Sequence, residues 1–117
     1  MSQDLVLYEI LRNLKISQGK RCSQVVHAGN KSYCYSNFRL VNEWINTGSK
    51  TIILESRFEL EYNKLKSVLS KNNLKYFPIV DSGLTYVEPG TQTCFSVETL
   101  YHNKYYKDIF KDYKLLK

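Results

Sequence analysis

The residues of this chain that could do chemistry fall in two polar segments, and the second of them runs from Asp81 to Thr93. Apolar residues 76–80 precede this segment and residues 94–97 follow it. An acidic residue at a strand end, followed by two threonines eight positions apart, Thr85 and Thr93, is typical of a shaped polar site. Two-residue turns are enough to join strands, so a mere connector needs no such loop. The alternative interpretation is an Asx-turn with two solvated threonines.

The first polar segment, residues 17–28, follows an apolar run at residues 5–10. A strand, a turn containing Ser and Gly, and a helix start together present backbone N–H groups to an anion. Spacings of four, three and four predict one outward helical face with a lysine, an amide and an imidazole: Lys20, Gln24, His27 and Lys31. We expect the opposite side to face a sheet: Cys22, Val25, Val26 and Gly29. A solvated amphipathic face is the alternative, and a lone His27 is more often a neutral surface residue than a catalyst.

The elements that must position these residues alternate between strands and helices. The patterns predict strands at 4–10, 51–54, 75–80 and 92–97, and helices at 19–34, 37–47, 57–72 and 102–111. This order predicts one α/β domain, residues 1–117, a three-layer α/β/α arrangement with a four-stranded mixed, mostly parallel sheet. Ligands bind outside the carboxyl ends of strands in open α/β sheets, so the turn after the first strand and the loop after the third should converge.

Both segments resemble sequence blocks of the archaeal/eukaryotic-type peptidyl-tRNA hydrolase family. Residues 13–28 read N-L-K-I-S-Q-G-K-R-C-S-Q-V-V-H-A, where the family has D-[LI]-K-M-G-K-G-K-x-A-A-Q-x-x-H-A. Residues 81–93 read D-S-G-L-T-Y-V-E-P-G-T-Q-T, where the family has D-A-G-x-T-Q-x-x-P-G-[ST]-x-T. The tail at residues 113–116 also resembles the family's L-K-L-L-like end. The resemblance spans nearly the whole chain.

The resemblance implies hydrolysis of the ester between a peptide and the ribose of tRNA, with no metal or organic cofactor. No Ser or Cys nucleophile with a partnered histidine is evident, so direct attack by water is expected. Asp81 would orient or deprotonate that water or fix Lys20, and Lys20 would meet a phosphate or the oxyanion. Gln24 would hold a carbonyl or amide, and Thr85 and Thr93 would position water or the terminal ribose. The expected catalytic set is Lys20, Gln24, His27, Asp81, Thr85 and Thr93. The expected tRNA-binding set is Lys15, Gly19, Lys20, Arg21 and Lys31.

Several residues depart from the family pattern where substrate contact is expected. The departures are Asn13, Ser17, Gln18, Leu84, Tyr86 and the pair Glu98-Thr99. They leave the expected catalytic residues intact, which favours altered substrate docking with retained chemistry. Four of them, Ser17, Gln18, Leu84 and Tyr86, also leave open an alternative, a catalytically impaired tRNA- or protein-binding module on the same fold.

Composition fits this interpretation. The chain has 117 residues, 43% of them hydrophobic and 24% charged, which is ordinary for one globular domain. A net charge of +6 favours a polyanionic partner such as RNA. Three widely spaced cysteines argue against zinc and disulfides, and the lack of an apolar stretch of membrane-spanning length argues against a membrane partner, so we expect a cytoplasmic protein. Aromatic residues near the second helix (Tyr33, Tyr35, Phe38, Trp44) suggest a possible homodimer.

Overall fold

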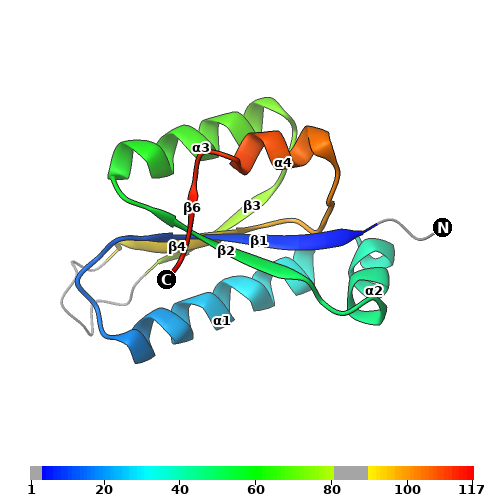
Figure 1. Cartoon of the computed structure of the whole chain (residues 1–117). Coiled ribbons are helices and arrows are strands. Elements are labelled where there is room, and N and C mark those ends of the chain that lie inside the picture. Colours follow the sequence, from blue (N-terminus) through cyan, green and yellow to red (C-terminus); the bar gives the residue numbers. More distant parts are fainter. Residues whose placement is uncertain (1–3, 81–89) are drawn as a thin grey trace.

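A computed structural model of the chain, which describes residues 4–80 and 90–117, contains the predicted elements (Figure 1). Their bounds are β1 Leu5–Arg12, α1 Gln18–Tyr35, α2 Phe38–Asn46, β2 Thr51–Ser56, α3 Glu59–Lys71, β3 Tyr76–Val80, β4 Gln92–Val97, β5 Leu100–Tyr101, α4 Lys104–Phe110 and β6 Lys114–Leu115. Every predicted boundary lies within two residues of the observed one. The short strands β5 and β6 were not predicted. None of the helices in the described part of the chain has the length and apolar character needed to cross a membrane.

The sheet is mixed, as predicted, but its strand number and pairing differ from the prediction. Its order is β3-β4-β1-β2-β6, with β5 paired to β1, so residues 4–80 and 90–117 contribute six strands rather than four. Only β1 and β2 pair in parallel, because β4 lies between β3 and β1 and runs antiparallel to both. The expectation of a mostly parallel sheet was therefore wrong. Local sequence patterns predict which segments form strands and helices. The position of β4 between β3 and β1 depends instead on tertiary packing.

The two faces of the sheet differ in character. Helices α3 and α4 lie on one face and α1 and α2 on the other (Figure 1). The α3 face is apolar, with Tyr8, Ile10 and Phe95 packed in one cluster with Tyr62 and Leu65. The α1 face holds buried polar residues as well: Glu9, Gln24, Ser32 and Ser96. The polar site is therefore built on the α1 face, and the α3 face supplies most of the hydrophobic core.

Helix α1 packs on the sheet through a different side from the one predicted. Its buried residues are Gln24, Ala28 and Ser32, spaced by four, while Cys22 is exposed and Val26 is 59% exposed. The Ser96 hydroxyl donates to the Ala28 carbonyl at 2.6 Å, and the Ser32 hydroxyl donates to the Val97 carbonyl at 2.8 Å. Small and polar side chains allow this close approach and satisfy the polar groups that it buries. The prediction assumed that the apolar residues of the helix must face the sheet, and for Gln24, Cys22 and Val26 it was wrong.

Candidate active site

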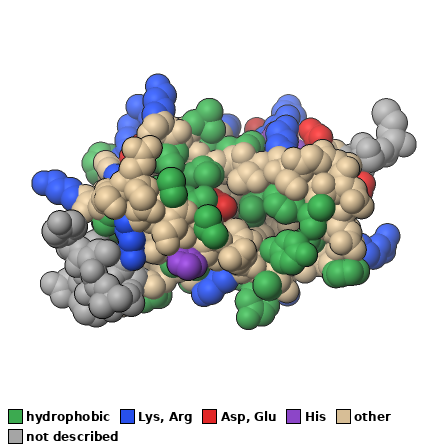
Figure 2. Space-filling model, turned by 90° about the horizontal axis from the view of Figure 1, so that it is seen from below, with side chains coloured by type: hydrophobic (Ala, Val, Ile, Leu, Met, Phe, Trp, Pro, Cys, Tyr) green, Lys and Arg blue, Asp and Glu red, His purple; other side chains and the backbone are tan. Residues whose placement is uncertain are grey.

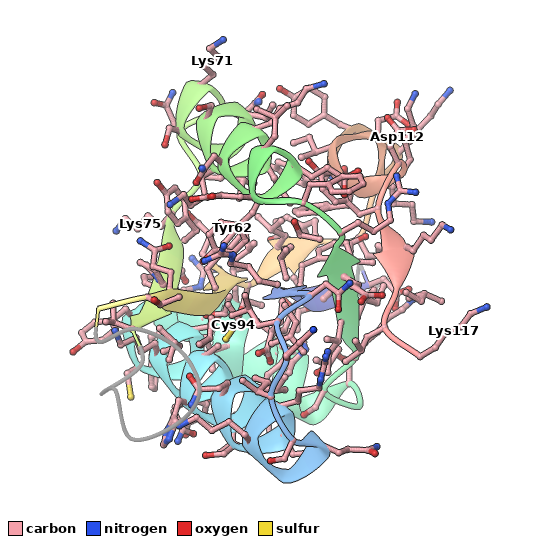
Figure 3. The ribbon with its side chains drawn as sticks, turned by 90° about the vertical axis from the view of Figure 1, so that its left-hand side faces the viewer. Tyr62, Lys71, Lys75, Cys94, Asp112 and Lys117 are labelled. Atoms are coloured by element: carbon pink, nitrogen blue, oxygen red, sulfur yellow. The ribbon has the colours of Figure 1, made fainter. Side chains whose placement is uncertain are left out.

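The candidate site lies where β1 ends, α1 begins and β4 begins. The Arg12 guanidinium donates to the Gln92 carbonyl at 2.9 Å, which fixes the end of β1 against the start of β4. The backbone N–H of Asn13 donates to the Ser56 carbonyl at 3.0 Å, so the chain leaves the sheet in a defined direction. Figure 3 faces this end of the molecule and shows Cys94 between the sheet and α1 and Tyr62 between the sheet and α3.

Ser17 starts α1 and places Lys20 in its first turn. The Ser17 hydroxyl accepts a hydrogen bond from the Lys20 backbone N–H at 3.1 Å, the contact expected of an N-cap residue. The N-terminal end of a helix carries partial positive charge, and the first turn of α1 contains no acidic residue to offset it. The half-buried Lys20 adds a full positive charge there. This end of α1 is therefore suited to an anionic substrate group or a developing oxyanion.

A β-bulge in β4 brings Thr93 to the α1 side of the sheet. The pairing of β3 with β4 steps from Ile79–Cys94 to Val80–Gln92, so Thr93 is the extra residue. A bulge re-aims a side chain that regular alternation would send to the other face. The Thr93 hydroxyl accordingly donates to Gln24 Oε1 at 2.6 Å, and the Cys94 thiol contacts the Gln24 carbonyl oxygen at 3.5 Å.

The Gln24–Thr93 hydrogen bond orients an amide inside the site. Both residues are buried, with 4% and 0% of their surfaces exposed. The amide oxygen of Gln24 accepts this hydrogen bond, which fixes the direction in which the NH₂ group of Gln24 can donate. A fixed N–H donor can bind a carbonyl oxygen and stabilise the negative charge that forms on it during attack by water.

The other predicted site residues within the described part of the chain lie on or near α1. His27 is exposed, and its Nε2 lies 3.4 Å from the hydroxyl of Ser23. Lys31 donates to the Pro78 carbonyl at 3.1 Å and Arg21 to the Leu14 carbonyl at 2.9 Å, so both cations stand beside the site while bonding backbone oxygens. Lys15 and Gly19 are exposed. Asp81 and Thr85 lie outside the described residues, and their roles stay predictions.

Cys94 and Glu9 are buried at this site and were not predicted from the sequence. The pKa of the Cys94 thiol is raised to about 12, mainly by burial, with an opposing effect of the Thr93 hydrogen bond and a smaller upward effect of the Glu9 charge. The thiol is thus protonated at neutral pH and is a poor nucleophile. Burial also raises the pKa of Glu9 to about 8. In the sequence, the only indication that these two residues are buried is that each lies in a mostly apolar run.

A family profile and several known proteins match most of the chain. The sequence profile described as peptidyl-tRNA hydrolase PTH2 matches residues 5–116. The peptidyl-tRNA hydrolase of Methanopyrus kandleri is 33% identical over 87 residues, which cover 73% of this chain and 75% of that protein. The peptidyl-tRNA hydrolase of Methanococcus maripaludis is 31% identical over 111 residues, which cover 92% of this chain and 95% of that protein. The predicted resemblance to this family is therefore confirmed, and the chain belongs to the peptidyl-tRNA hydrolase PTH2 family.

Proposed function

We propose that this protein is a peptidyl-tRNA hydrolase that cleaves the ester between peptide and tRNA by direct attack of water and so recycles tRNA. The observation that carries the proposal is the buried Gln24–Thr93 hydrogen bond beside the N-terminal turn of α1. Ester hydrolysis needs a fixed donor for the oxyanion, and the amide of Gln24 supplies one. The protonated thiol of Cys94 supports water rather than a cysteine as the nucleophile.

In this mechanism the chain's residues divide between binding the carbonyl and placing the water. Gln24 donates to the ester carbonyl, and Thr93 holds Gln24 in the orientation that allows this. Lys20 neutralises a phosphate or the oxyanion at the positive end of α1. Asp81 orients or deprotonates the water and Thr85 positions it or the terminal ribose. Lys15, Arg21 and Lys31 contribute positive charge toward the RNA backbone.

Two of the departures from the family pattern have structural roles, which weakens the case for a catalytically impaired binding module. Ser17, which replaces a family glycine, serves as the N-cap of α1. Glu98, which replaces part of a Gly-Pro turn, accepts a hydrogen bond from the Lys75 backbone N–H at 2.6 Å and joins the start of β3 to the end of β4. Both departures thus have a structural role that requires no loss of catalysis.

The free state of Cys22, Cys34 and Cys94 supports action in a reducing compartment such as the cytoplasm.

The test of the proposal is turnover. Purified protein incubated with an N-blocked aminoacyl-tRNA should release free tRNA over many cycles, and Lys20→Ala should lower the rate by about 100-fold, because it removes a full charge near the reacting ester. Acid-gel separation of charged from free tRNA measures both rates. The variant, purified identically, also controls for contaminating hydrolases, whose activity the substitution would leave unchanged. Folded native protein that binds tRNA without turnover would favour the binding-module alternative instead.

The proposal includes a homodimer formed through the exposed aromatic residues at the α1–α2 junction. Tyr33, Tyr35 and Phe38 are 56%, 65% and 77% exposed. Figure 2, which views the α1 and α2 side, shows hydrophobic side chains at several places on this surface. Apolar surface of this kind favours self-association because burying it removes it from water.

Light scattering tests the dimer. The native chain should show twice the 13.8 kDa monomer mass at low micromolar concentration, and Phe38→Ser should weaken dimerisation by about tenfold, the effect of losing about 1.4 kcal/mol of burial. Leu60→Ser on α3 is the matched control, because Leu60 is 79% exposed on the other face of the sheet. A native protein that scatters only as 13.8 kDa would contradict the prediction.

A further inference from the structure

A polar pocket lies at the same end of the molecule as the Gln24–Thr93 site, on the α3 side of the sheet. Its volume is about 370 Å³. The residues that matter for its chemistry are Arg12, Glu59, Tyr62, Lys66, Thr91 and Gln92. Gln92 precedes Thr93 directly, and the two side chains lie on opposite faces of the sheet, Thr93 bonded to Gln24 and Gln92 bonded to Tyr62 and Lys66. The pocket is therefore next to the Gln24–Thr93 site along the chain but separated from it by the sheet.

Two positive charges are gathered over one aromatic ring in this pocket. The Arg12 guanidinium lies 5.5 Å and the Lys66 ammonium 5.1 Å from the centroid of the Tyr62 ring. Both distances fall within the range of a cation–π contact. Tyr62 is only 2% exposed, so the ring is a fixed support for the two cations.

The hydrogen bonds of these cations go to neutral oxygens. Arg12 donates to the Gln92 carbonyl at 2.9 Å, and Lys66 donates to Gln92 Oε1 at 3.1 Å. The Tyr62 hydroxyl also donates to Gln92 Oε1, at 2.9 Å. Within residues 4–80 and 90–117, neither Arg12 nor Lys66 forms an ion pair with a carboxylate, although Glu59 lines the pocket. A guanidinium and an ammonium each carry more N–H donors than these bonds use, so the pocket presents charged donors that pair with no carboxylate of the described residues.

We propose that this pocket binds a phosphate of the tRNA strand whose ester is cleaved at the Gln24–Thr93 site. The inference rests on the proposed function for the identity of the ligand. A guanidinium beside an ammonium matches the charge and the several acceptor oxygens of a phosphate. A phosphate is present at every nucleotide, whereas the peptide has no constant anionic group. The RNA backbone would then cross the edge of the sheet, with the reacting ester on the α1 side and a bound phosphate on the α3 side.

Lys66→Gln tests the site, with Lys64→Gln as the matched control. Both lysines lie on α3, but Lys64 lines a different pocket, between α3 and α4. Glutamine at 66 keeps an N–H donor for Gln92 and removes the charge. Binding of deacylated tRNA, measured across a series of salt concentrations, should weaken about fivefold to tenfold at low salt in Lys66→Gln, and the slope of log K against log[salt] should fall by about 0.7–0.9. Lys64→Gln should match the native protein in both respects.

Turnover measurements separate this inference from the proposed function. With N-blocked aminoacyl-tRNA, Lys66→Gln should raise KM and leave kcat within about twofold of native, because the pocket binds the strand away from the reacting ester. If the two lysine variants have equal affinity and equal salt slopes while the native chain hydrolyses its substrate, the pocket is not a phosphate site and the proposed function stands. If affinity depends on Lys66 but the native chain shows no turnover, the phosphate site stands and the proposed function fails. Thermal unfolding of both variants confirms that each is folded.

Discussion

The double replacement Gln24→Met and Thr93→Val is expected to remove most of the turnover while the protein keeps nearly native stability. Each substitution has nearly the shape of the residue it replaces, and together they remove both partners of a buried hydrogen bond. Replacing both partners by apolar groups of the same shape is close to neutral for folding. The loss of the Gln24 amide donor should lower kcat by about 10²–10³-fold, the typical effect of removing one oxyanion donor.

The single variants separate structure from catalysis. Thr93→Val leaves the buried Gln24 Oε1 without its donor, and Gln24→Met leaves the Thr93 hydroxyl without its acceptor. Each should therefore lose about 1–3 kcal/mol of unfolding free energy, most of which the double variant regains. Thr93→Ser, which keeps the hydroxyl, should retain most of the activity. Urea unfolding and turnover on the same preparations measure both quantities. A double variant with native kcat would show that Gln24 takes no part in the reaction.

Glu9→Gln is expected to stabilise the protein at high pH by several kcal/mol. Glu9 is 2% exposed in β1, and its Oε1 has no hydrogen-bond partner among the described residues. Burial raises its pKa from 4.5 to about 8. The folded protein therefore holds a proton that the unfolded chain releases, and the stability from Glu9 is fully present below pH 4.5 and lost as pH rises through about 8. At about 1.4 kcal/mol per pH unit, the total loss is about 4–5 kcal/mol.

Urea unfolding at pH 5, 7 and 9 measures this effect. Glutamine imitates the neutral carboxyl, so the stability of Glu9→Gln should change much less between pH 5 and 9, and its advantage over the native protein should grow with pH. Glu55→Gln on the neighbouring strand β2 is the control, because Glu55 is only half-buried. Its curve should follow the native one. Parallel curves for Glu9→Gln and the native protein would mean that Glu9 is ionised in the folded state or reaches solvent.

Local sequence patterns predicted the helices and strands well, because hydrophobic periodicity and turn residues act over a few positions. The apolar run at residues 94–97 next to the polar segment predicted β4 at residues 92–97, which are its observed bounds. The partners of β4 were not predictable, because pairing β4 with β1 depends on contacts across more than 80 positions. Glu9 shows the same limit. Its neighbours Tyr8 and Ile10 identify a buried strand, but a carboxyl in that strand gives no local signal of whether it is paired.

Two residues predicted for the site are in contact, but the geometry of that contact was not predicted. Gln24 and Thr93 were both expected at the carboxyl edge of the sheet, and they are in direct contact. The route to that contact was missed, since Gln24 was expected to point outward and is buried against the sheet. Spacing along a helix shows which residues share a face. It does not show which face packs inward when the sheet beneath is itself polar.

The extra residue in β4 makes chain length a determinant of the site, separate from side-chain chemistry. Removing one residue between Thr91 and Cys94 would restore the regular alternation of the strand, even if a threonine remained next to Cys94. That threonine would then face α3, and Gln24 would lose its donor. A related chain could thus keep every polar residue of the site and still lack the Gln24–Thr93 contact through a single deletion. The number of residues in this strand therefore determines the contact as much as their identity does.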